Sequence, residues 1–249
     1  MFTHTEPVIT AVCPTYGRPL HLLKNTLAAF AAQTERRSRL VILDDLGNLA
    51  GAECRVPNVE IISTPNRFPS LPEKYNELLR HVNTPYVAVW EDDDLYLPWH
   101  LENLVIAFEA VPNATWLHPS QVWSTYTGRP LKESARGRFH ASLAFRTYYV
   151  RIHKGWPISR HETFDQIFLS SLERWFGPPV DHTSGYVFRW NDTLAIHGQH
   201  VMGGNGLSWY EKYTPQNTEP VHVLEPEFDA SSQQILACPE VNRDYVIIG

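Results

Sequence analysis

The sequence predicts an α/β fold organised around a mostly parallel central sheet. Short apolar runs rich in β-branched residues alternate with amphipathic helical patterns over about the first 110 residues. The 249 residues are 43% hydrophobic and 19% charged, so the chain has enough apolar residues for a sizeable core and is not wholly disordered. Polar or acidic residues directly follow three of the apolar runs, as they do where strands end at a ligand-binding edge.

Four apolar runs in the first half of the chain are predicted strands. They are residues 8–13, 40–43, 59–63 and 86–90. Apolar residues at helical spacing predict helices over residues 20–33 and 98–110. A further helix is predicted to begin after Ser70, which forms a capping box with Glu73, and to run through Val82. This alternation predicts right-handed crossovers, with helices flanking the sheet.

The second half of the chain is less regular. Strand-like segments are residues 116–126, 143–152, 186–190 and 193–196. Residues 162–176 carry an apolar face at helical spacing and are predicted to form a helix. The glycines of residues 203–206 predict a loop, and a tail that wraps the domain is expected from Pro215 onward. The absence of a repeat or linker predicts a single domain over residues 1–249.

Charge and cysteine content argue against several classes of protein. A formal net charge of -6 is not that of a generic polyanion binder. Three scattered cysteines are too few for a disulfide framework or a zinc cluster. The N-terminus lacks a basic-then-apolar signal pattern, and no window approaches the ~18 consecutive apolar residues of a membrane span. We therefore expect a cytoplasmic protein with no membrane partner.

Polar segments after three predicted strands are expected to meet in one cleft, because carboxyl ends of parallel strands share an edge. These segments are residues 15–18, residues 44–45 and the acidic run, Glu91–Asp94. Residues two apart on a strand project to the same side, with ~7 Å between their Cα atoms. We therefore expect Glu91 and Asp93 to face one cation. Clustered carboxylates repel one another, and their hard oxygens suit Mg²⁺ or Mn²⁺.

The same segments resemble those of GT-A glycosyltransferases, most closely the family 2 enzymes. The similarity lies in the first strand and turn VITAVCPTYGRP (8–19), the second strand LVILDD (40–45) and VAVWEDDDLYLPWHLENLV (87–105). The last segment resembles the family's Asp-X-Asp motif and the helix after it. The resemblance implies a GT-A, Rossmann-like sheet flanked by helices. It makes residues 1–110 a nucleotide-sugar-binding half and residues 111–249 an irregular acceptor-side half with a C-terminal tail.

The resemblance also implies an activity and a set of donor-side residues. The expected reaction is inverting transfer of a sugar from a nucleotide sugar, a UDP-sugar, to an acceptor hydroxyl, with Mn²⁺ or Mg²⁺ as cofactor. The implied donor-binding residues are Pro14, Thr15, Tyr16, Arg18, Asp44, Asp45, Lys74, Glu91 and Asp92. Glu91 stands where the family usually has aspartate. Asp93 is the implied metal ligand, and His197, preferred to His200, is a second candidate.

An inverting transfer needs a base that removes the proton of the acceptor hydroxyl, and a carboxylate commonly does this. The resemblance places the base within residues 161–165. Glu162 and Asp165 lie one helical turn apart there, so they share a helix face. Both are candidates for the catalytic base, with Asp165 slightly preferred because Phe164 and Ile167 lie beside it.

A basic stretch over residues 129–160 is compatible with a polyanionic acceptor, and equally with a solvated face that balances acidic residues elsewhere. It contains eight basic residues with interleaved aromatic ones and a single acid, Glu133. Arg136, Arg138 and Trp156 are the candidate acceptor contacts. The resemblance implies a saccharide acceptor or, because some bacteriophage enzymes of this broad fold modify DNA, a hydroxymethylated base in DNA.

Two other functions share part of this pattern. A nucleotidyltransferase also combines a parallel sheet with carboxylates and a metal, but residues 14–18 are not the glycine-rich basic loop expected after its first strand. A catalytically inactive nucleotide- or glycan-binding module is the third possibility, because Glu91 replaces the usual aspartate. Metal-dependent hydrolysis of the donor separates the enzymes from this module.

Overall fold

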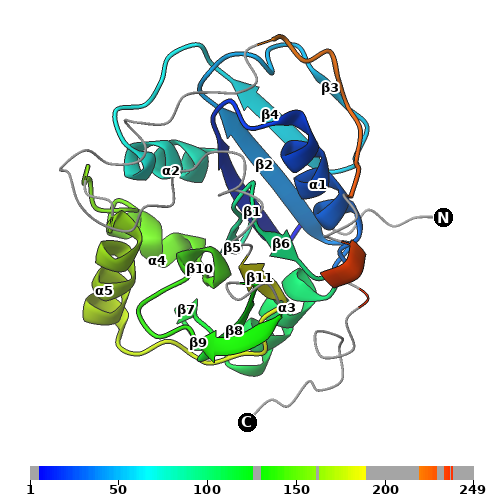
Figure 1. Cartoon of the computed structure of the whole chain (residues 1–249). Coiled ribbons are helices and arrows are strands. Elements are labelled where there is room, and N and C mark those ends of the chain that lie inside the picture. Colours follow the sequence, from blue (N-terminus) through cyan, green and yellow to red (C-terminus); the bar gives the residue numbers. More distant parts are fainter. Residues whose placement is uncertain are drawn as a thin grey trace.

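A six-stranded, mostly parallel sheet lies at the centre of the molecule (Figure 1). The computed structural model describes residues 6–125, 130–160, 163–188, 219–228, 233–235 and 237. The strand order is β4-β2-β1-β5-β10-β7, and β10 is the strand that runs antiparallel to its neighbours. The bounds are β1 Ile9–Thr15, β2 Ser38–Asp44, β4 Val59–Ser63, β5 Tyr86–Val89, β7 Trp116–Leu117 and β10 Ala144–Arg146.

The first half of the chain folds as the sequence predicts. All four predicted strands are present, and the three helices are α1 Leu20–Ala31, α2 Leu71–Arg80 and α3 His100–Ala110. Ser70 caps α2, because its Oγ accepts a hydrogen bond from the backbone N–H of Glu73 at 3.4 Å. α2 packs on β1 and β2, and α3 packs on β5 and β7. The apolar faces that predicted these helices therefore cover the sheet.

A second, four-stranded sheet lies beside the first, in the order β6-β11-β8-β9. Its strands are β6 Leu95–Tyr96, β8 Gln121–Ser124, β9 Leu131–Ser134 and β11 Tyr186–Phe188. β6 begins directly after the acidic run, so this sheet fixes the end of the run in space. Neither β6 nor β9 was predicted, because two- and four-residue strands carry too little periodicity to be recognised.

Two expectations for the second half are wrong in detail. Residues 116–126 do not form one strand but divide into β7 and β8. Residues 143–152 divide into β10 and the short helix α4, Thr147–Ile152. Where the strand gives way to the helix, Thr147 donates to the carbonyls of Thr84 and Pro85, and the Arg151 guanidinium donates to those of Leu79 and Val82. The predicted helix is α5, Phe164–Phe176, and residues 193–196 and 203–206 lie outside the described residues.

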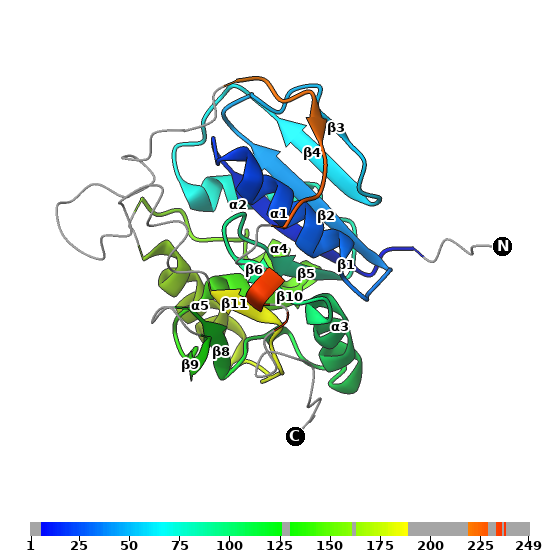
Figure 2. The same cartoon turned by 45° about the vertical axis from the view of Figure 1, so that its right-hand side comes forward.

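A strap formed by residues 219–228 crosses the molecule over α1, as expected for a wrapping tail (Figure 2). Its strand β12, Val223–Leu224, pairs in parallel with β3, Glu53–Cys54. The backbone N–H of Glu227 donates to the carbonyl of Lys24 on α1 at 3.1 Å. None of the helices within the described ranges has the length and apolar content to cross a bilayer.

The connection after α4 provides a stability test. Gly155 has φ +77°, and a Cβ atom added there would lie 2.2 Å from Oδ1 of Asn76. Gly137 has φ +68° with open space around it. We expect Gly155→Ala to lower the free energy of unfolding by about 2–4 kcal/mol, since backbone strain and overpacking add.

Gly137→Ala is the matched control, because it carries the same backbone strain without the clash. It should lower the free energy of unfolding by only about 1 kcal/mol. Urea denaturation of both variants measures the difference. Equal losses would contradict the packing described around Asn76.

Candidate functional site

The strand order places an opening at the carboxyl ends of β1 and β5. The chain passes from β1 to β2 and β4 on one side, and then returns to place β5 on the other side of β1. Loops that leave neighbouring strands in opposite directions open a crevice between them, which is where ligands of such sheets bind. Pro14 and Thr15 end β1, and the loop through Arg18 borders this crevice. The acidic run borders it from the end of β5.

Arg18 bridges two carboxylates of the acidic run. Its Nε donates to Oδ1 of Asp92 at 2.8 Å, and its Nη2 donates to Oδ2 of Asp93 at 2.6 Å. Burial raises the pKa of Asp92, and the Arg18 guanidinium is the largest influence that opposes this rise. The two carboxylates therefore converge on one point of positive charge.

Glu91 and Asp93 have different partners, whereas strand alternation predicted that both face one cation. Its carboxylate accepts a hydrogen bond from the Tyr75 hydroxyl, and its Oε1 lies 3.6 Å from Nδ1 of His140. The reason is that β5 ends at Val89, so the two-residue period of a strand no longer applies at the acidic run. The carboxylates that share a partner are the adjacent Asp92 and Asp93.

The surroundings of Glu91 favour its neutral form. Burial raises its pKa well above the usual range, and the charge of Asp93 adds to this effect. Burial also lowers the pKa of His140 to about 3, so this imidazole is neutral. Tyr75 packs against both His140 and Trp156, with ring centroids 5.2 and 4.6 Å away. Glu91 thus belongs to a buried aromatic cluster under the acidic run.

Asp44 organises the loop after β2. Its Oδ1 accepts a hydrogen bond from the N–H of Leu46, and its Oδ2 accepts from the N–H groups of Gly47 and Leu49 and from the Ser63 hydroxyl. The side chain is fully buried. Four donors account for the hydrogen-bonding capacity of a carboxylate. The structure thus gives Asp44 a role in fixing this loop, and its implied contact with the donor stays a prediction.

Asp45 and Lys74 form a buried ion pair behind the crevice. Lys74 Nζ donates both to Oδ1 of Asp45 and to the carbonyl of Thr15, and both side chains are 1% exposed or less. Oδ2 of Asp45 accepts from the N–H of Phe68 at 2.9 Å. Burial lowers the pKa of Lys74, and Asp45 opposes that change. This pair joins the ends of β1 and β2 to α2 and to the loop before it.

Arg67 is a candidate donor-side residue that the sequence analysis missed. Its guanidinium lies 4.2 Å from the centroid of the Tyr16 ring, in the loop that Asp45 holds through Phe68. Tyr16 follows β1 and Arg67 follows β4, so both leave strands at the same edge of the sheet. The rule that gathers polar residues at strand ends could have identified Arg67, because it lies four residues after predicted strand 59–63.

Asp165 lies in the first turn of α5, beside the aromatic cluster. The neighbouring Phe164 ring is 5.5 Å from the ring of His140, which in turn adjoins Glu91. Burial raises the pKa of Asp165. Glu162 and His197 lie outside the described residues, so the structure locates only Asp165 among the candidate bases.

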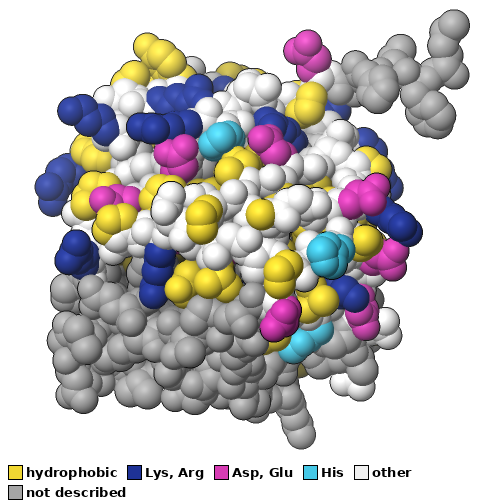
Figure 3. Space-filling view, turned by 90° about the horizontal axis from the view of Figure 1, so that it is seen from above, with side chains coloured by type: hydrophobic (Ala, Val, Ile, Leu, Met, Phe, Trp, Pro, Cys, Tyr) yellow, Lys and Arg dark blue, Asp and Glu magenta, His cyan; other side chains and the backbone are white. Residues whose placement is uncertain are grey.

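Of the three predicted acceptor contacts, one is buried and two are exposed. Trp156 is 1% exposed and stacks between Tyr75 and Phe168, so it packs in the core and presents no surface to an acceptor. Arg138 pairs with Glu133 at 3.1 Å, and Arg136 is exposed nearby. Figure 3 shows acidic, basic and apolar side chains interspersed on the face seen from above.

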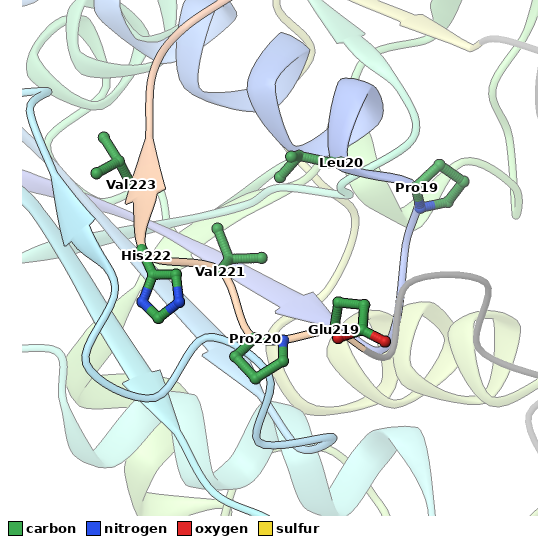
Figure 4. Close-up of a pocket in the computed structure, with 7 residues that line it drawn as sticks. All are labelled: Pro19, Leu20, Glu219, Pro220, Val221, His222 and Val223. Carbon is green, nitrogen blue, oxygen red and sulfur yellow. The ribbon is translucent and has the colours of Figure 1, made fainter.

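The strap reaches the loop that carries Arg18. A hollow of about 460 Å³ is lined by residues 219–223 of the strap and by Pro19 and Leu20 at the start of α1 (Figure 4). In the close-up, Glu219 lies next to Pro19 although two hundred residues separate them in the chain. The strap therefore borders the β1 end of the crevice.

The acidic run fits a cation held jointly by protein and substrate. Among the described residues, no group of three or more His, Cys, Asp or Glu side chains is arranged to hold a metal ion. Asp92 and Asp93 nevertheless direct oxygens at one cationic group. Mg²⁺ and ions like it are commonly bound by one or two carboxylates together with waters and substrate phosphates. The pair suits that kind of site, and not an all-protein cage.

Sequence comparison agrees with this geometry. A family model described as "Glycosyl transferase family 2" matches residues 10–161, more than half of the chain. The match includes β1, the acidic run, Lys74 and Arg67. A comparison with curated protein sequences gives no significant match.

Solved structures share the fold at low sequence identity. TarS from S. aureus superposes with a TM-score of 0.57 at 13% identity, over 74% of this chain and 37% of TarS. Its 1–349 form in complex with UDP-GlcNAc superposes with a TM-score of 0.58 at 12% identity, over 74% of this chain and 59% of that one. The mannosyltransferase PcManGT from Pyrobaculum calidifontis was solved in complex with GDP-Man and Mn²⁺. It superposes with a TM-score of 0.53 at 17% identity, over 75% of this chain and 57% of PcManGT. The chain thus spans less than two thirds of these structures, and the predicted GT-A fold is confirmed.

The buried pair of Lys74 and Asp45 generates a testable prediction. Lys74→Met leaves the Asp45 carboxylate buried without its cation, so we expect the free energy of unfolding to fall by about 3–5 kcal/mol. The double variant Lys74→Met/Asp45→Asn removes both charges and should lose less. Urea denaturation of the single and double variants gives the coupling between them. If the unfolding free energy lost in the double variant equalled the sum of the losses in the Lys74→Met and Asp45→Asn single variants, a direct ion pair would be ruled out.

Proposed function

Given that this chain belongs to glycosyl transferase family 2 and is therefore a glycosyltransferase, we propose that it transfers a sugar from a UDP-sugar to an acceptor hydroxyl with inversion. The observation that supports this proposal most directly is the Arg18 bridge to Asp92 and Asp93 at the switch point of a parallel sheet. A diphosphate is bound by positive charge. The Arg18 guanidinium supplies positive charge at the carboxyl ends of β1 and β5, beside two carboxylates that suit a metal ion. The family assignment favours this activity over a nucleotidyltransferase.

The proposed roles follow from the contacts around the crevice. Arg18 and Arg67 lie on the loops after β1 and β4 and are proposed to bind the diphosphate, because guanidinium groups match phosphate geometry. Tyr16, packed under Arg67, is proposed to contact the nucleoside. Lys74 acts indirectly, by fixing the carbonyl of Thr15 and the carboxylate of Asp45.

Asp93 is proposed as the protein ligand of Mn²⁺ or Mg²⁺, with Asp92 beside it and His197 as a further candidate. The mannosyltransferase named above was solved with Mn²⁺, which supports this choice of ion. When bound, the metal supplies Lewis-acid stabilisation of the departing diphosphate. Glu91 is proposed as a structural residue, because Tyr75 and His140 hold its carboxyl away from Arg18.

The chemical step is a single displacement at the anomeric carbon. The acceptor oxygen forms a bond to that carbon while the bond to the β-phosphate oxygen breaks, and the nucleoside diphosphate leaves with the electron pair. A carboxylate of Asp165 or Glu162 takes the proton of the acceptor hydroxyl. The raised pKa of Asp165 suits a base, since it brings the group nearer to the working pH.

The acceptor is proposed to be a saccharide hydroxyl rather than a base in DNA. Arg138, Arg146 and Arg151 of the basic stretch all engage protein oxygens, which reduces the charge available to a polyanion. The test of function is transfer from a panel of nucleotide sugars with Mn²⁺, with saccharide and hydroxymethylated-DNA acceptors in parallel. Neither transfer nor metal-dependent donor hydrolysis with any donor would favour the inactive binding module instead.

The proposed metal site predicts that Arg18→Gln has opposite effects on Mn²⁺ affinity without and with nucleotide. Asp93→Asn should weaken Mn²⁺ binding at least about tenfold, because one anionic ligand is lost. Arg18→Gln should strengthen Mn²⁺ binding about fivefold without nucleotide, because the guanidinium no longer competes for the carboxylates. With uridine diphosphate present, the same Arg18→Gln change should weaken binding, since a phosphate partner is lost. Calorimetry measures all three changes.

Arg36→Gln is the matched control, because Arg36 is exposed on the connection before β2. It should leave the affinity for Mn²⁺ unchanged in both conditions. If Arg18→Gln changed the affinity in the same direction with and without nucleotide, the proposed exchange of partners would be wrong.

The base assignment predicts a change in pH dependence. A carboxylate base must be ionised, and its raised pKa places the acid limb of kcat/KM above the ordinary aspartate value of about 3.9. The rate should therefore fall as the pH drops through this raised pKa. Asp165→Asn should lower kcat about 10²–10⁴-fold and remove the limb, while donor affinity persists.

Glu173→Gln, at the other end of α5, is the control and should keep both the rate and the pH profile. Glu162→Gln distinguishes the two candidate bases. A full rate in Asp165→Asn together with a lost limb in Glu162→Gln would assign the base to Glu162.

A further inference from the structure

Exposed apolar side chains gather on one short segment. Among the described residues, four large hydrophobic side chains are exposed. Three of them are Tyr148 at 70%, Ile152 at 56% and Ile158 at 63%, and the fourth is Val223 on the strap at 39%. A single exposed apolar residue needs no explanation, but a group on one segment of a folded surface indicates a contact. We call Tyr148, Ile152 and Ile158, with the basic residues between and after them, the α4 patch.

The α4 patch rests on a rigid base. Arg151 holds α4 to the end of α2 through two carbonyl oxygens, and the Asn76 side chain bonds both the N–H and the carbonyl of Trp156, at 2.7 and 2.9 Å. His153 stacks on Trp175 of α5 with ring centroids 4.5 Å apart. The exposed side chains therefore project from an anchored turn, and their exposure is a feature of the fold.

The α4 patch is also the basic part of an acidic protein. Lys154 and Arg160 are exposed among its apolar side chains, while the guanidinium of Arg151 anchors the segment to α2. The sequence has no Asp or Glu between Glu133 and Glu162, although the whole chain carries a net charge of -6. Apolar and cationic side chains thus share one surface.

The combination favours one kind of partner. A second copy joined by a two-fold axis would bring Lys154 and Arg160 against the same cations. A nucleic acid would pair with the cations but leave the side chains of Ile152 and Ile158 without an apolar contact. An anionic lipid surface accepts both, because apolar side chains enter the acyl boundary while Lys and Arg remain at the headgroups.

We propose that the α4 patch docks the enzyme on an anionic membrane surface, where it meets a membrane-borne saccharide acceptor. The part concerning the acceptor rests on the proposed function. α4 packs on α5, which carries the candidate base Asp165 in its first turn, and both helices lie at an edge of the molecule away from the strap (Figure 1). Docking through α4 holds the C-terminal end of α5, the helix that carries Asp165, next to the bilayer. The sequence analysis had led us to expect no membrane partner.

Vesicle sedimentation without donor or acceptor tests the docking itself. The wild-type chain is expected to sediment with vesicles of phosphatidylcholine and phosphatidylglycerol, and not with phosphatidylcholine alone. Tyr148→Ser/Ile152→Ser should lower the partition coefficient about tenfold, because both side chains leave the acyl boundary. Lys154→Glu should lower it about fivefold or more and reduce its salt dependence.

Matched controls are Val223→Ser, an exposed apolar residue on the strap, and Arg36→Glu, an exposed cation before β2. Both should sediment like the wild type. Absence of wild-type binding to the anionic vesicles, or equal binding by the double variant, would overturn the proposal. So would retention on duplex DNA, or self-association in light scattering, that the same double variant abolishes.

The two proposals fail separately. Vesicle binding without any transfer activity would refute the proposed function and leave docking intact. Full transfer to soluble saccharides with no vesicle binding would refute docking and leave the proposed function intact.

Discussion

Buried carboxylates at the carboxyl ends of parallel strands are the constraint on which this site depends. Asp45 and Asp92 are both at most 2% exposed, and a charge in such a place needs a partner. Lys74 supplies the cation for Asp45, and Arg18 supplies it for Asp92 together with Asp93. These two contacts join the loop after β1 to the loops after β2 and β5 and to α2. The geometry of the crevice is therefore maintained by charge pairing as much as by apolar packing.

The first half of the fold could be predicted because local pattern and tertiary structure agree there. β1, β2 and β5 are largely buried runs and β4 is a half-buried one, all bounded by clear breaks, and Ser70 with Glu73 marks the start of α2. The second half was harder, because its strands are short and its turns depend on distant contacts. α4 follows β10 directly, held by bonds from Thr147 and Arg151 to carbonyls of residues 79–85, and no local pattern reports such contacts.

The location of the candidate site could be predicted from the sequence, but the contacts of its individual residues could be predicted only in part. The rule that carboxyl ends of parallel strands share an edge placed residues 15–18, Asp44, Asp45 and the acidic run at one end of the sheet, where the structure also has them. It did not reveal that Asp44 bonds its own loop, or that Glu91 turns toward Tyr75 and His140. His140 comes from a turn at residues 140–142, and its place beside Glu91 follows from packing between the two sheets. Burial, likewise, is what removes Trp156 from the acceptor surface.

The central claim is that the acidic run and Arg18 together form a site for a cation and a diphosphate. A crystal structure of the chain with Mn²⁺ and uridine diphosphate tests it most directly. The account predicts an ion on Asp93 and the Arg18 guanidinium within about 3 Å of a phosphate oxygen, displaced from its present carboxylate partners. An Arg18 that keeps both carboxylates while the nucleotide binds elsewhere, with no ion at Asp93, would contradict it.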